Sequence, residues 1–399
     1  MKMTQTLSQS QLADYHRDGY VVLRGAISES EILRLEQGVA NNPPLDGTLD
    51  PNAPIYPAPG RYTLATHCAR DPDLAFIIEH PTIVGAVREV LNDDPKLTAY
   101  VIYDRTPQGA GLPAHHDYKR WRPVGSSMHW LFTIVPFCDF DAEAGPLFVA
   151  PGSHRLERVK PGQPMEIDAA VRPNDDAFVD PGLRRGDLLL MNMHLWHRAD
   201  ANHSAKHRVG LFNKYAAASY PPATGYYLYH SDVAQALSPD GRNLLAVHSS
   251  QEIVTTRVLL MRERGASTEV LLRETRDGLC LPGGLARVEK AIPDWDEGNF
   301  IASAQQHLRE QLLIEAPWLS YVGDYAEHSD GLCRLYAYTL NNNGFPVPYE
   351  GVWVDTDTLT SAALTHDWLA AAVATWQDPN IVRGKGLSQA QCRLDQFAY

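Results

Sequence analysis

The chain has 399 residues, 44% of them hydrophobic, which is more than one core usually accommodates, so we expect two domains. The 48 acidic residues outnumber the 35 basic ones, and the net charge of −13 repels both nucleic acid and an anionic membrane surface. Five scattered cysteines without a CxxC pair indicate neither a disulfide framework nor a zinc knuckle.

The N-terminal half begins with an expected helix, strand and helix. The opening MKMTQTLSQSQ has no apolar signal core, and no apolar run is long enough to span a bilayer, so we expect a soluble, unprocessed, cytoplasmic protein. A helix capped by Ser8 is expected from residue 8 to 14, then strand composition over residues 19–27, then a second capped helix in SESEILRLEQGV.

From Leu97 to Tyr215 the chain consists of short β-rich runs separated by Gly, Pro, Asp and Asn, which is typical of a sandwich or barrel. Turn-forming residues crowd the stretches 220–225 and 238–243, and a new β-rich run follows in EIVTTRVLLMRER. We therefore predict one domain over residues 1–250 and a second over 251–399.

The stretch LPAHHDYKRW, residues 112–121, carries a candidate metal-binding pattern. Alternate residues of a strand face the same way, so His115 and Asp117 can point to one site while His116 points to the opposite side. One histidine and one carboxylate lack a second histidine for the facial triad that binds iron(II) with open positions. On its own, the HxD pattern has little specificity and favours a surface pair or a hydrogen-bonded core pair over a metal site.

The first 230 residues or so resemble the phytanoyl-CoA dioxygenase family of iron(II)/2-oxoglutarate oxygenases. The resemblance rests on YHRDGYVVLRGAIS, HHD, AGPLFVAPGSH and GDLLLMNMHLWHRADANHSAKHR, in that order. It implies a double-stranded β-helix (jelly-roll, cupin-like) barrel with flanking helices. It also implies that His197 is the distal iron ligand, that Asn202 and Ser204 form the family's N-x-S, and that Arg208 holds 2-oxoglutarate.

The remaining histidines favour structural roles. His194 is expected to be buried or at a strand edge, His154 to cap a turn, and His203 and His207 to lie in a solvated loop. Family members often carry a hydroxyl residue two positions after the distal histidine, where this chain has Ala199. That contact with the cosubstrate is therefore absent here or comes from Ser204.

The resemblance implies that Fe(II), 2-oxoglutarate and O2 are used together, with release of succinate and CO2. Related halogenases replace the iron carboxylate with a small residue, whereas Asp117 is present here, so hydroxylation, desaturation or cyclisation of an aliphatic carbon is favoured. The expected partner is a small molecule, such as an amino-acid derivative or natural-product intermediate.

Cations and one aromatic residue near the HxD stretch are the candidates for substrate binding: Arg105, Lys119, Trp121 and Arg122. A basic, aromatic mouth would suit an anionic substrate. The alternative is that these residues are rim charges of the kind common on any protein surface.

Residues 251–399 resemble a Nudix domain in RVLLMRERGASTEVLLRETRDGLCLPGG and in the Arg309–Glu310 pair of a predicted helix. The glutamate pair expected three and four residues after Glu310 is Leu313 and Ile314, which with Leu308 and Leu312 indicate an apolar packing face. We expect a smaller α/β/α domain that does not hydrolyse diphosphates, although Glu289 and Glu315 leave a rebuilt site open. Its expected roles are support of the barrel, a lid, or contact in a homodimer.

The whole chain is thus expected to be an α+β protein with an oxygenase barrel and an accessory domain. Two other functions are considered. A Nudix-type pyrophosphohydrolase is disfavoured by the missing carboxylates, and a non-catalytic metabolite-binding protein is disfavoured by the complete set of His115, Asp117, His197 and Arg208.

Overall fold

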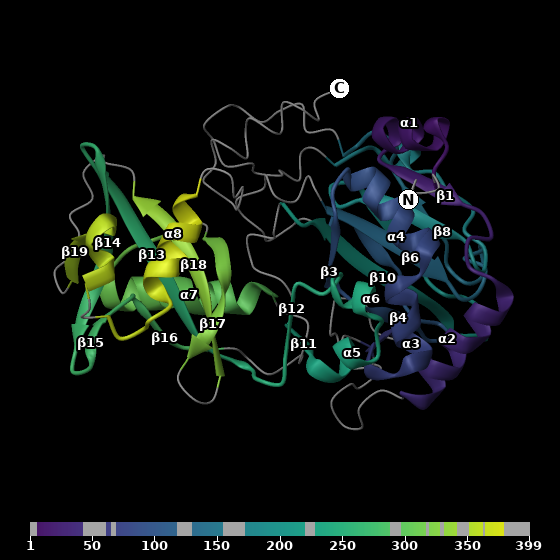
Figure 1. Cartoon of the computed structure of the whole chain (residues 1–399). Helices are drawn as coiled ribbons and strands as arrows, with labels where there is room; N and C mark the ends of the chain where they lie inside the picture. The colour runs from purple at the N-terminus through teal and green to yellow at the C-terminus, as the bar shows by residue number, and fades with distance from the viewer. Residues whose placement is uncertain are drawn as a thin grey trace.

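The computed structural model describes residues 6–42, 61–64, 69–117, 130–154, 172–219, 228–287, 297–316, 319–327, 331–340, 351–361 and 364–378. Their strands form two large sheets, one from strands in residues 20–217 and one from strands in residues 253–355 (Figure 1).

The chain begins with α1 (Gln9–Asp18), β1 (Tyr20–Leu23) and α2 (Glu29–Asn41). Ser8 and Gln11 form a capping box on α1, and Ser28 and Glu31 form another on α2. Gly19 ends α1 with a φ of +83°, a conformation that favours glycine. The helix, strand and helix predicted from the sequence are therefore confirmed, with a strand shorter than expected.

The first large sheet has the strand order β1-β8-β6-β10-β4-β2, and β3 also pairs with β10. Its other strands are β2 (Arg61–Leu64), β3 (Pro95–Ala99), β4 (Ile102–Arg105), β6 (Trp130–Pro136), β8 (Leu188–Asn192) and β10 (Arg208–Ala217). A small sheet has the order β5-β9-β7, from β5 (Leu112–His115), β7 (Leu147–Val149) and β9 (His197–Ala199). The large sheet and the small sheet, both antiparallel, together form the predicted jelly-roll.

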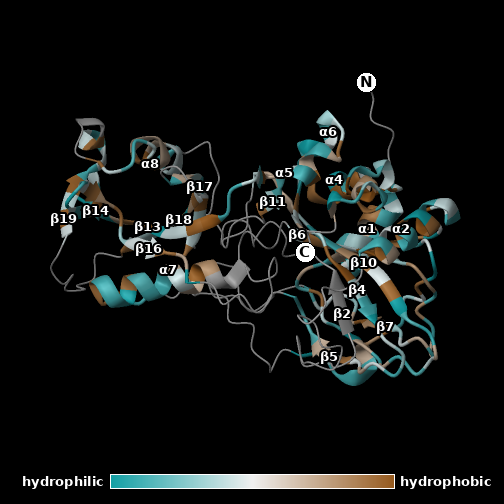
Figure 2. Cartoon of the chain, turned by 90° about the horizontal axis from the view of Figure 1, so that it is seen from below, coloured by the Kyte–Doolittle hydropathy of each residue, from teal (hydrophilic) through white to brown (hydrophobic). Residues whose placement is uncertain are grey.

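Every residue of β6 and β8 is buried, because both faces of the large sheet are covered. The outer face packs against α2, α3 (Pro72–Ala75) and α4 (Pro81–Leu91), and Figure 2 shows hydrophobic colour on α4. The cluster on this face includes Ile32, Leu35, Leu74, Ile83, Val87, Leu131, Val135, Leu190 and Leu211. The inner face packs against the small sheet through Phe132, Ile134, Met191, Phe212, Leu147 and Val149.

Short elements lie between the two large sheets in sequence. They are β11 (Leu228–His230), α5 (Ser231–Gln235), α6 (Pro239–Arg242) and β12 (Val247–Ser249), and β11 pairs with β12 in parallel. In the described stretches before them, 3-10 helices occur at Phe76–Glu79 and Asp175–Ala177.

The second large sheet has the order β15-β14-β13-β18-β17, with β16 beside β13 and β19 beside β14. Its strands are β13 (Ile253–Arg264), β14 (Ser267–Thr275), β15 (Gly278–Cys280), β16 (Gly283–Leu285), β17 (Ser320–Glu327), β18 (Gly331–Leu340) and β19 (Gly351–Asp355). Val258 and Leu260 pack with α7 (Glu297–Leu312). Leu259 and Met261 pack with α8 (Leu369–Gln377), which follows a 3-10 helix at Thr356–Ser361. Alternate residues of β13 thus face helices on opposite sides of the sheet.

The predicted apolar face of α7 is correct at three positions and wrong at one. Leu308, Leu312 and Ile314 are buried, whereas Leu313 is 77% exposed. The reason is that α7 ends at Leu312 and Leu313 adopts a φ of +54°, so the helical periodicity no longer applies there. In the described part of the chain, no helix is long and apolar enough to cross a membrane.

The contrast between Leu308 and Leu313 gives a stability test. Leu308→Ala should destabilise the second sheet by about 2–5 kcal/mol, because it leaves a cavity between α7 and the strands. Leu313→Ala, the matched control, should change stability by less than about 0.5 kcal/mol. Urea unfolding of the full chain, followed by hydrogen exchange in β13 and β18, measures both; equal effects would contradict this packing.

Candidate metal centre

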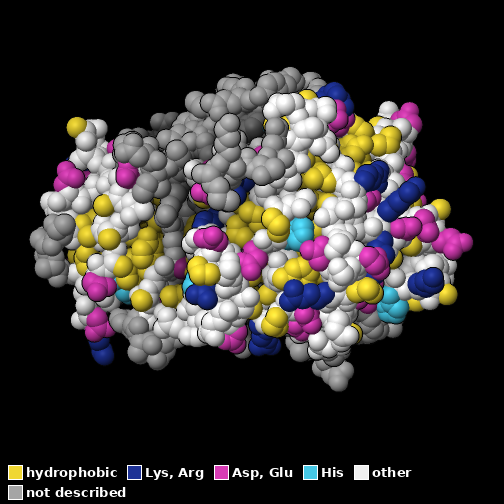
Figure 3. All heavy atoms as spheres, turned by 45° about the vertical axis from the view of Figure 1, so that its right-hand side comes forward, with side chains coloured by type: hydrophobic (Ala, Val, Ile, Leu, Met, Phe, Trp, Pro, Cys, Tyr) yellow, Lys and Arg dark blue, Asp and Glu magenta, His cyan; other side chains and the backbone are white. Residues whose placement is uncertain are grey.

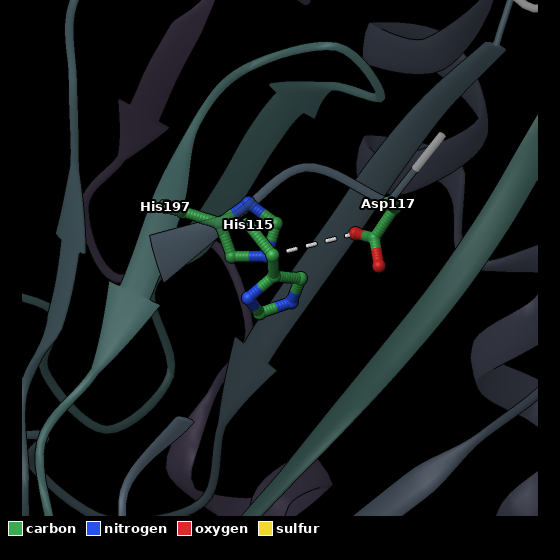
Figure 4. Close-up of side chains that lie close together, drawn as sticks. All are labelled: His115, Asp117 and His197. Atoms are coloured by element: carbon green, nitrogen blue, oxygen red, sulfur yellow. Dashed lines mark ion pairs between the residues drawn. The ribbon is translucent and has the colours of Figure 1, made fainter. Parts of the chain in front are cut away.

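Three potential metal ligands meet where β5 and β9 pair. His115 is the last residue of β5, Asp117 follows two residues later, and His197 is the first residue of β9. His115 and His197 are direct partners in the antiparallel register, and one ligand atom from each of the three residues lies within 4.8 Å of the others. Figure 4 shows the two rings and the carboxylate directed toward one another. The sequence predicted this grouping.

Backbone carbonyls fix the orientation of both rings. Nδ1 of His115 lies 2.7 Å from the Pro113 oxygen, and Nδ1 of His197 lies 3.0 Å from the Leu195 oxygen. When Nδ1 donates its proton in this way, the lone pair is on Nε2, the atom that then binds a metal. Nε2 of His197 lies 3.6 Å from Oδ2 of Asp117 (Figure 4). Two imidazole nitrogens and one carboxylate are a donor set that suits iron(II).

His116 lies outside this group, as predicted. Its ring is buried and meets Trp196 edge-on, with 4.9 Å between ring centroids. His194 is also buried, and burial, then the neighbouring His116 and His154, lower the pKa of His194 to about 3. His194 is therefore neutral at physiological pH.

The other histidines predicted to have structural roles lie outside the group of metal ligands. Nε2 of His154 lies 3.2 Å from the His16 oxygen, and a side chain at Gly19 would clash with the His154 ring. His203 and His207 are exposed, and Nδ1 of His207 lies 2.9 Å from Oδ1 of Asp104.

Arg208, the first residue of β10, is buried beneath the inner face of the barrel. Its guanidinium lies over the Phe140 ring at 3.6 Å from the centroid, and its Nε has no hydrogen-bond partner among the residues that the structure describes. Burial, then the nearby Arg105, hold the pKa of Arg208 well below its usual value. A buried cation in this state fits an anionic ligand, and guanidinium is suited to a carboxylate. Sequence reasoning missed Phe140, which no local pattern marks.

The loop between β9 and β10 is held by Asn202, which is fully buried. Its Nδ2 donates to the backbone oxygens of Arg105 at 3.3 Å, Thr106 at 3.1 Å and Lys206 at 2.7 Å. The Ser204 hydroxyl donates to Oδ1 of Asn202 at 2.7 Å. The structure thus gives Asn202 and Ser204 a role in the turn that places Arg208, and a contact of Ser204 with 2-oxoglutarate stays a prediction.

Arg105 is buried inside the barrel and does not lie at its rim. It is 3% exposed, ends β4, and pairs in register with Arg208 on β10. This burial excludes the alternative of an exposed rim charge, and a contact of Arg105 with substrate stays a prediction. On the face shown in Figure 3, by contrast, Lys and Arg are interspersed with Asp and Glu at the surface. Lys119, Trp121 and Arg122 lie outside the described residues.

Comparisons with known proteins match the same part of the chain. The model of the family "Phytanoyl-CoA dioxygenase (PhyH)" matches residues 15–210. An ectoine dioxygenase from Sphingopyxis alaskensis is 24% identical over 240 residues, covering 53% of this chain and 77% of that protein. One from Bordetella bronchiseptica is 27% identical over 169 residues, covering 39% of this chain and 52% of that protein.

Among solved structures, the apoform of EctD from S. alaskensis aligns with a TM-score of 0.47 at 24% identity, covering 56% of this chain and 82% of that one. The carbocyclase SnoK from nogalamycin biosynthesis aligns with a TM-score of 0.45 at 21% identity, covering 55% of this chain and 88% of that one.

The three bonds from Asn202 predict a local loss of stability when its amide is removed. Asn202→Ala should lower the free energy of unfolding by about 1–3 kcal/mol, because buried carbonyl groups lose their donor. Gln108→Ala, which removes an exposed amide bonded to the His203 oxygen, is the control and should have little effect. Thermal unfolding and hydrogen exchange over residues 199–208 measure the difference, and similar values for both variants would contradict the role of Asn202.

Proposed function

We propose that residues 15–210, the part that matches the phytanoyl-CoA dioxygenase model, form an iron(II)- and 2-oxoglutarate-dependent dioxygenase that hydroxylates an aliphatic carbon of a small metabolite. The observation that supports this most is the grouping of His115, Asp117 and His197 within 4.8 Å, on the same inner side of the barrel as the buried Arg208. The metal would be held by the three ligands, and the cosubstrate by Arg208.

His115, Asp117 and His197 hold iron(II) in this proposal, and the three protein ligands leave positions open for 2-oxoglutarate and oxygen. The bound iron supplies oxidative chemistry, in which O2 and 2-oxoglutarate become succinate, CO2 and one oxygen atom inserted into the substrate C–H bond. The carbonyl oxygens of Pro113 and Leu195 keep both Nδ1 protons in place, so the two Nε2 atoms stay ligands.

Arg208 pairs with the distal carboxylate of 2-oxoglutarate. Its planar fork can form two parallel hydrogen bonds, and the Phe140 ring fixes the plane of the fork. Gly210 makes room for this arrangement, because a Cβ there would press on the rings of Phe140 and Phe212. Burial of the pair excludes water and strengthens the attraction.

The outcome favoured at the substrate is hydroxylation, because Asp117 keeps its carboxylate at the metal; desaturation or cyclisation uses the same residues. The ectoine dioxygenases among the relatives make ectoine the first compound to test on this chain. The prediction of an anionic substrate depends on Lys119 and Arg122, since Arg105 lies inside the barrel.

The second sheet and its helices, within the predicted domain 251–399, are proposed to be an accessory unit without hydrolase activity. Glu310 Oε1 accepts from Arg287 Nη1 at 2.7 Å and from Gln306 Nε2 at 2.8 Å. These bonds, that from Arg287 first, lower the pKa of Glu310, so the carboxylate is already occupied by protein donors. Its Nudix-like nature stays a prediction.

The proposed reaction is tested by loading the full chain with iron(II) under argon and then adding oxygen and 2-oxoglutarate with single compounds, beginning with ectoine. A true substrate should increase succinate formation and gain one oxygen atom in its mass. Absence of oxygen-dependent succinate, with or without any added compound, would overturn the proposal.

Substitution of the metal ligands separates the triad from its neighbours. His115→Ala or His197→Ala should weaken iron(II) binding by more than about a hundredfold, because a ligand loss exceeds the effect of losing its supporting partners. His116→Ala should leave iron binding intact, since its ring faces Trp196. Calorimetric titration with iron(II) under argon measures this, and wild-type affinity in His197→Ala would remove that residue from the site.

Arg208 should act on the cosubstrate and not on the metal. Arg208→Ala should raise the 2-oxoglutarate concentration needed for half-maximal rate at least about tenfold, because a charge-assisted pair is lost. Iron(II) affinity measured in the same protein should stay near the wild-type value. An unchanged 2-oxoglutarate requirement would exclude Arg208 from this contact.

A further inference from the structure

We propose that Ser153 is a positioning residue of the metal centre, whose hydroxyl holds the peptide group that orients His197. This rests on the function proposed above, in which His197 binds iron(II). Ser153 belongs to the stretch AGPLFVAPGSH, residues 144–154, which supplies none of the proposed metal or cosubstrate contacts. The inference gives this stretch a role at the metal.

The peptide group between Leu195 and Trp196 is hydrogen-bonded at both of its ends. Its carbonyl oxygen lies 3.0 Å from Nδ1 of His197, and its N–H donates to Oγ of Ser153 at 2.9 Å. A carbonyl oxygen can only accept, so Nδ1 of His197 is the donor. Because the carbonyl and the N–H of one peptide share a rigid plane, rotating that plane breaks both bonds. The Ser153 hydroxyl therefore fixes the direction of the carbonyl that orients the His197 ring.

Ser153 continues the pairing of β7 with β9 beyond the end of β7. Val149, the last residue of β7, is the direct partner of His197 in the antiparallel register. The chain then turns at Gly152, whose φ of +76° favours glycine, and brings the Ser153 side chain to the Trp196 N–H. A side-chain oxygen thus takes the place of a backbone acceptor in the segment that leads into His197.

The turn that carries Ser153 is held by its own backbone. The Gly152 N–H donates to the oxygen of Asp18, the last residue of α1, at 2.8 Å, and the Ser153 N–H donates to the Ala150 oxygen at 3.2 Å. Neither bond uses the Ser153 side chain. A substitution of that side chain therefore removes the acceptor of the Trp196 N–H and keeps the bonds that form the turn.

Loss of the hydroxyl should be felt at the metal because Trp196 is buried. Its N–H loses its acceptor, and with it goes the bond that opposes a tilt of the peptide, which would turn the Leu195 carbonyl away from His197. Removing a group that bonds the second nitrogen of a metal-binding histidine typically weakens metal affinity about tenfold to a hundredfold. Ser153 acts one hydrogen bond further out, so we expect the lower end of that range.

Ser238 supplies a matched control. Its hydroxyl also accepts a backbone N–H, that of Gly241, at 3.0 Å. The neighbouring Leu237 belongs to the apolar cluster on the outer face of the large sheet, whereas His197 lies on the small sheet. Ser238→Ala therefore removes an equivalent bond on the opposite side of the large sheet from the metal ligands.

The test measures metal binding in the full chain and needs no turnover. Cobalt(II) is the probe, because calorimetry gives its affinity and its visible absorption reports the geometry of its ligands. Ser153→Ala should weaken cobalt(II) binding about tenfold and change the absorption of the bound ion. Ser153→Thr, which keeps the hydroxyl, should recover most of the affinity and the wild-type spectrum. Ser238→Ala should match the wild type in both measurements.

The possible results separate this role from the proposed function. Wild-type affinity and spectrum in Ser153→Ala would overturn the role of Ser153 and leave the proposed function standing. An equal loss of affinity in Ser153→Ala and Ser238→Ala would show that the hydroxyl only supports the fold. Failure of the wild-type protein to bind cobalt(II) at all would overturn the proposed function and this role with it.

Discussion

The crossing from the small sheet to the large sheet, held by the side-chain amide of Asn202, is the constraint on which the whole candidate site depends. His197 lies on one side of this crossing and Arg208 on the other. The Asn202 amide donates to carbonyl groups from β4, from the turn after it and from the end of the loop itself. Because the amide is fully buried, water cannot replace these bonds, and the separation between the two functional residues is fixed.

Two glycines make that crossing sterically possible. A Cβ at Gly145, whose φ is +86°, would collide with the backbone of Asp200 and Ala201, and a Cβ at Gly111 would collide with the backbone of Ala199. The loop therefore lies directly on neighbouring backbone with no side chain between them. His194 is buried near His116 and His154, and its lowered pKa means that the His194 ring carries no positive charge at neutral pH.

Sequence reasoning succeeded where the determinant was local. His115 and Asp117 share a side and His116 does not, because alternation along an extended segment is a property of the backbone alone. The capping serines of α1 and α2 were visible for the same reason. The burial of Arg105 could not be predicted, because its surroundings depend on its pairing with Arg208, 103 positions away in the sequence. The contact of Phe140 with Arg208 likewise depends on packing that no short pattern encodes. The prediction that Leu313 is buried was wrong because α7 ends just before it. Leu313 itself adopts the positive φ, so no glycine in the sequence marks the end of the helix.

The two large sheets share an apolar core. Buried residues of the barrel interior, such as Phe132 and Met191, belong to one contiguous cluster with Leu260 and Leu308 from the α7 side of the second sheet. Among the described residues, the opposite side of that sheet packs against α8 and not against the barrel. A boundary near residue 250, which remains a prediction, would therefore separate the strands of the two sheets without separating their cores. Apolar burial between the two sheets stabilises their association, and Glu310, bound by Arg287 on the surface of α7, is not part of this cluster.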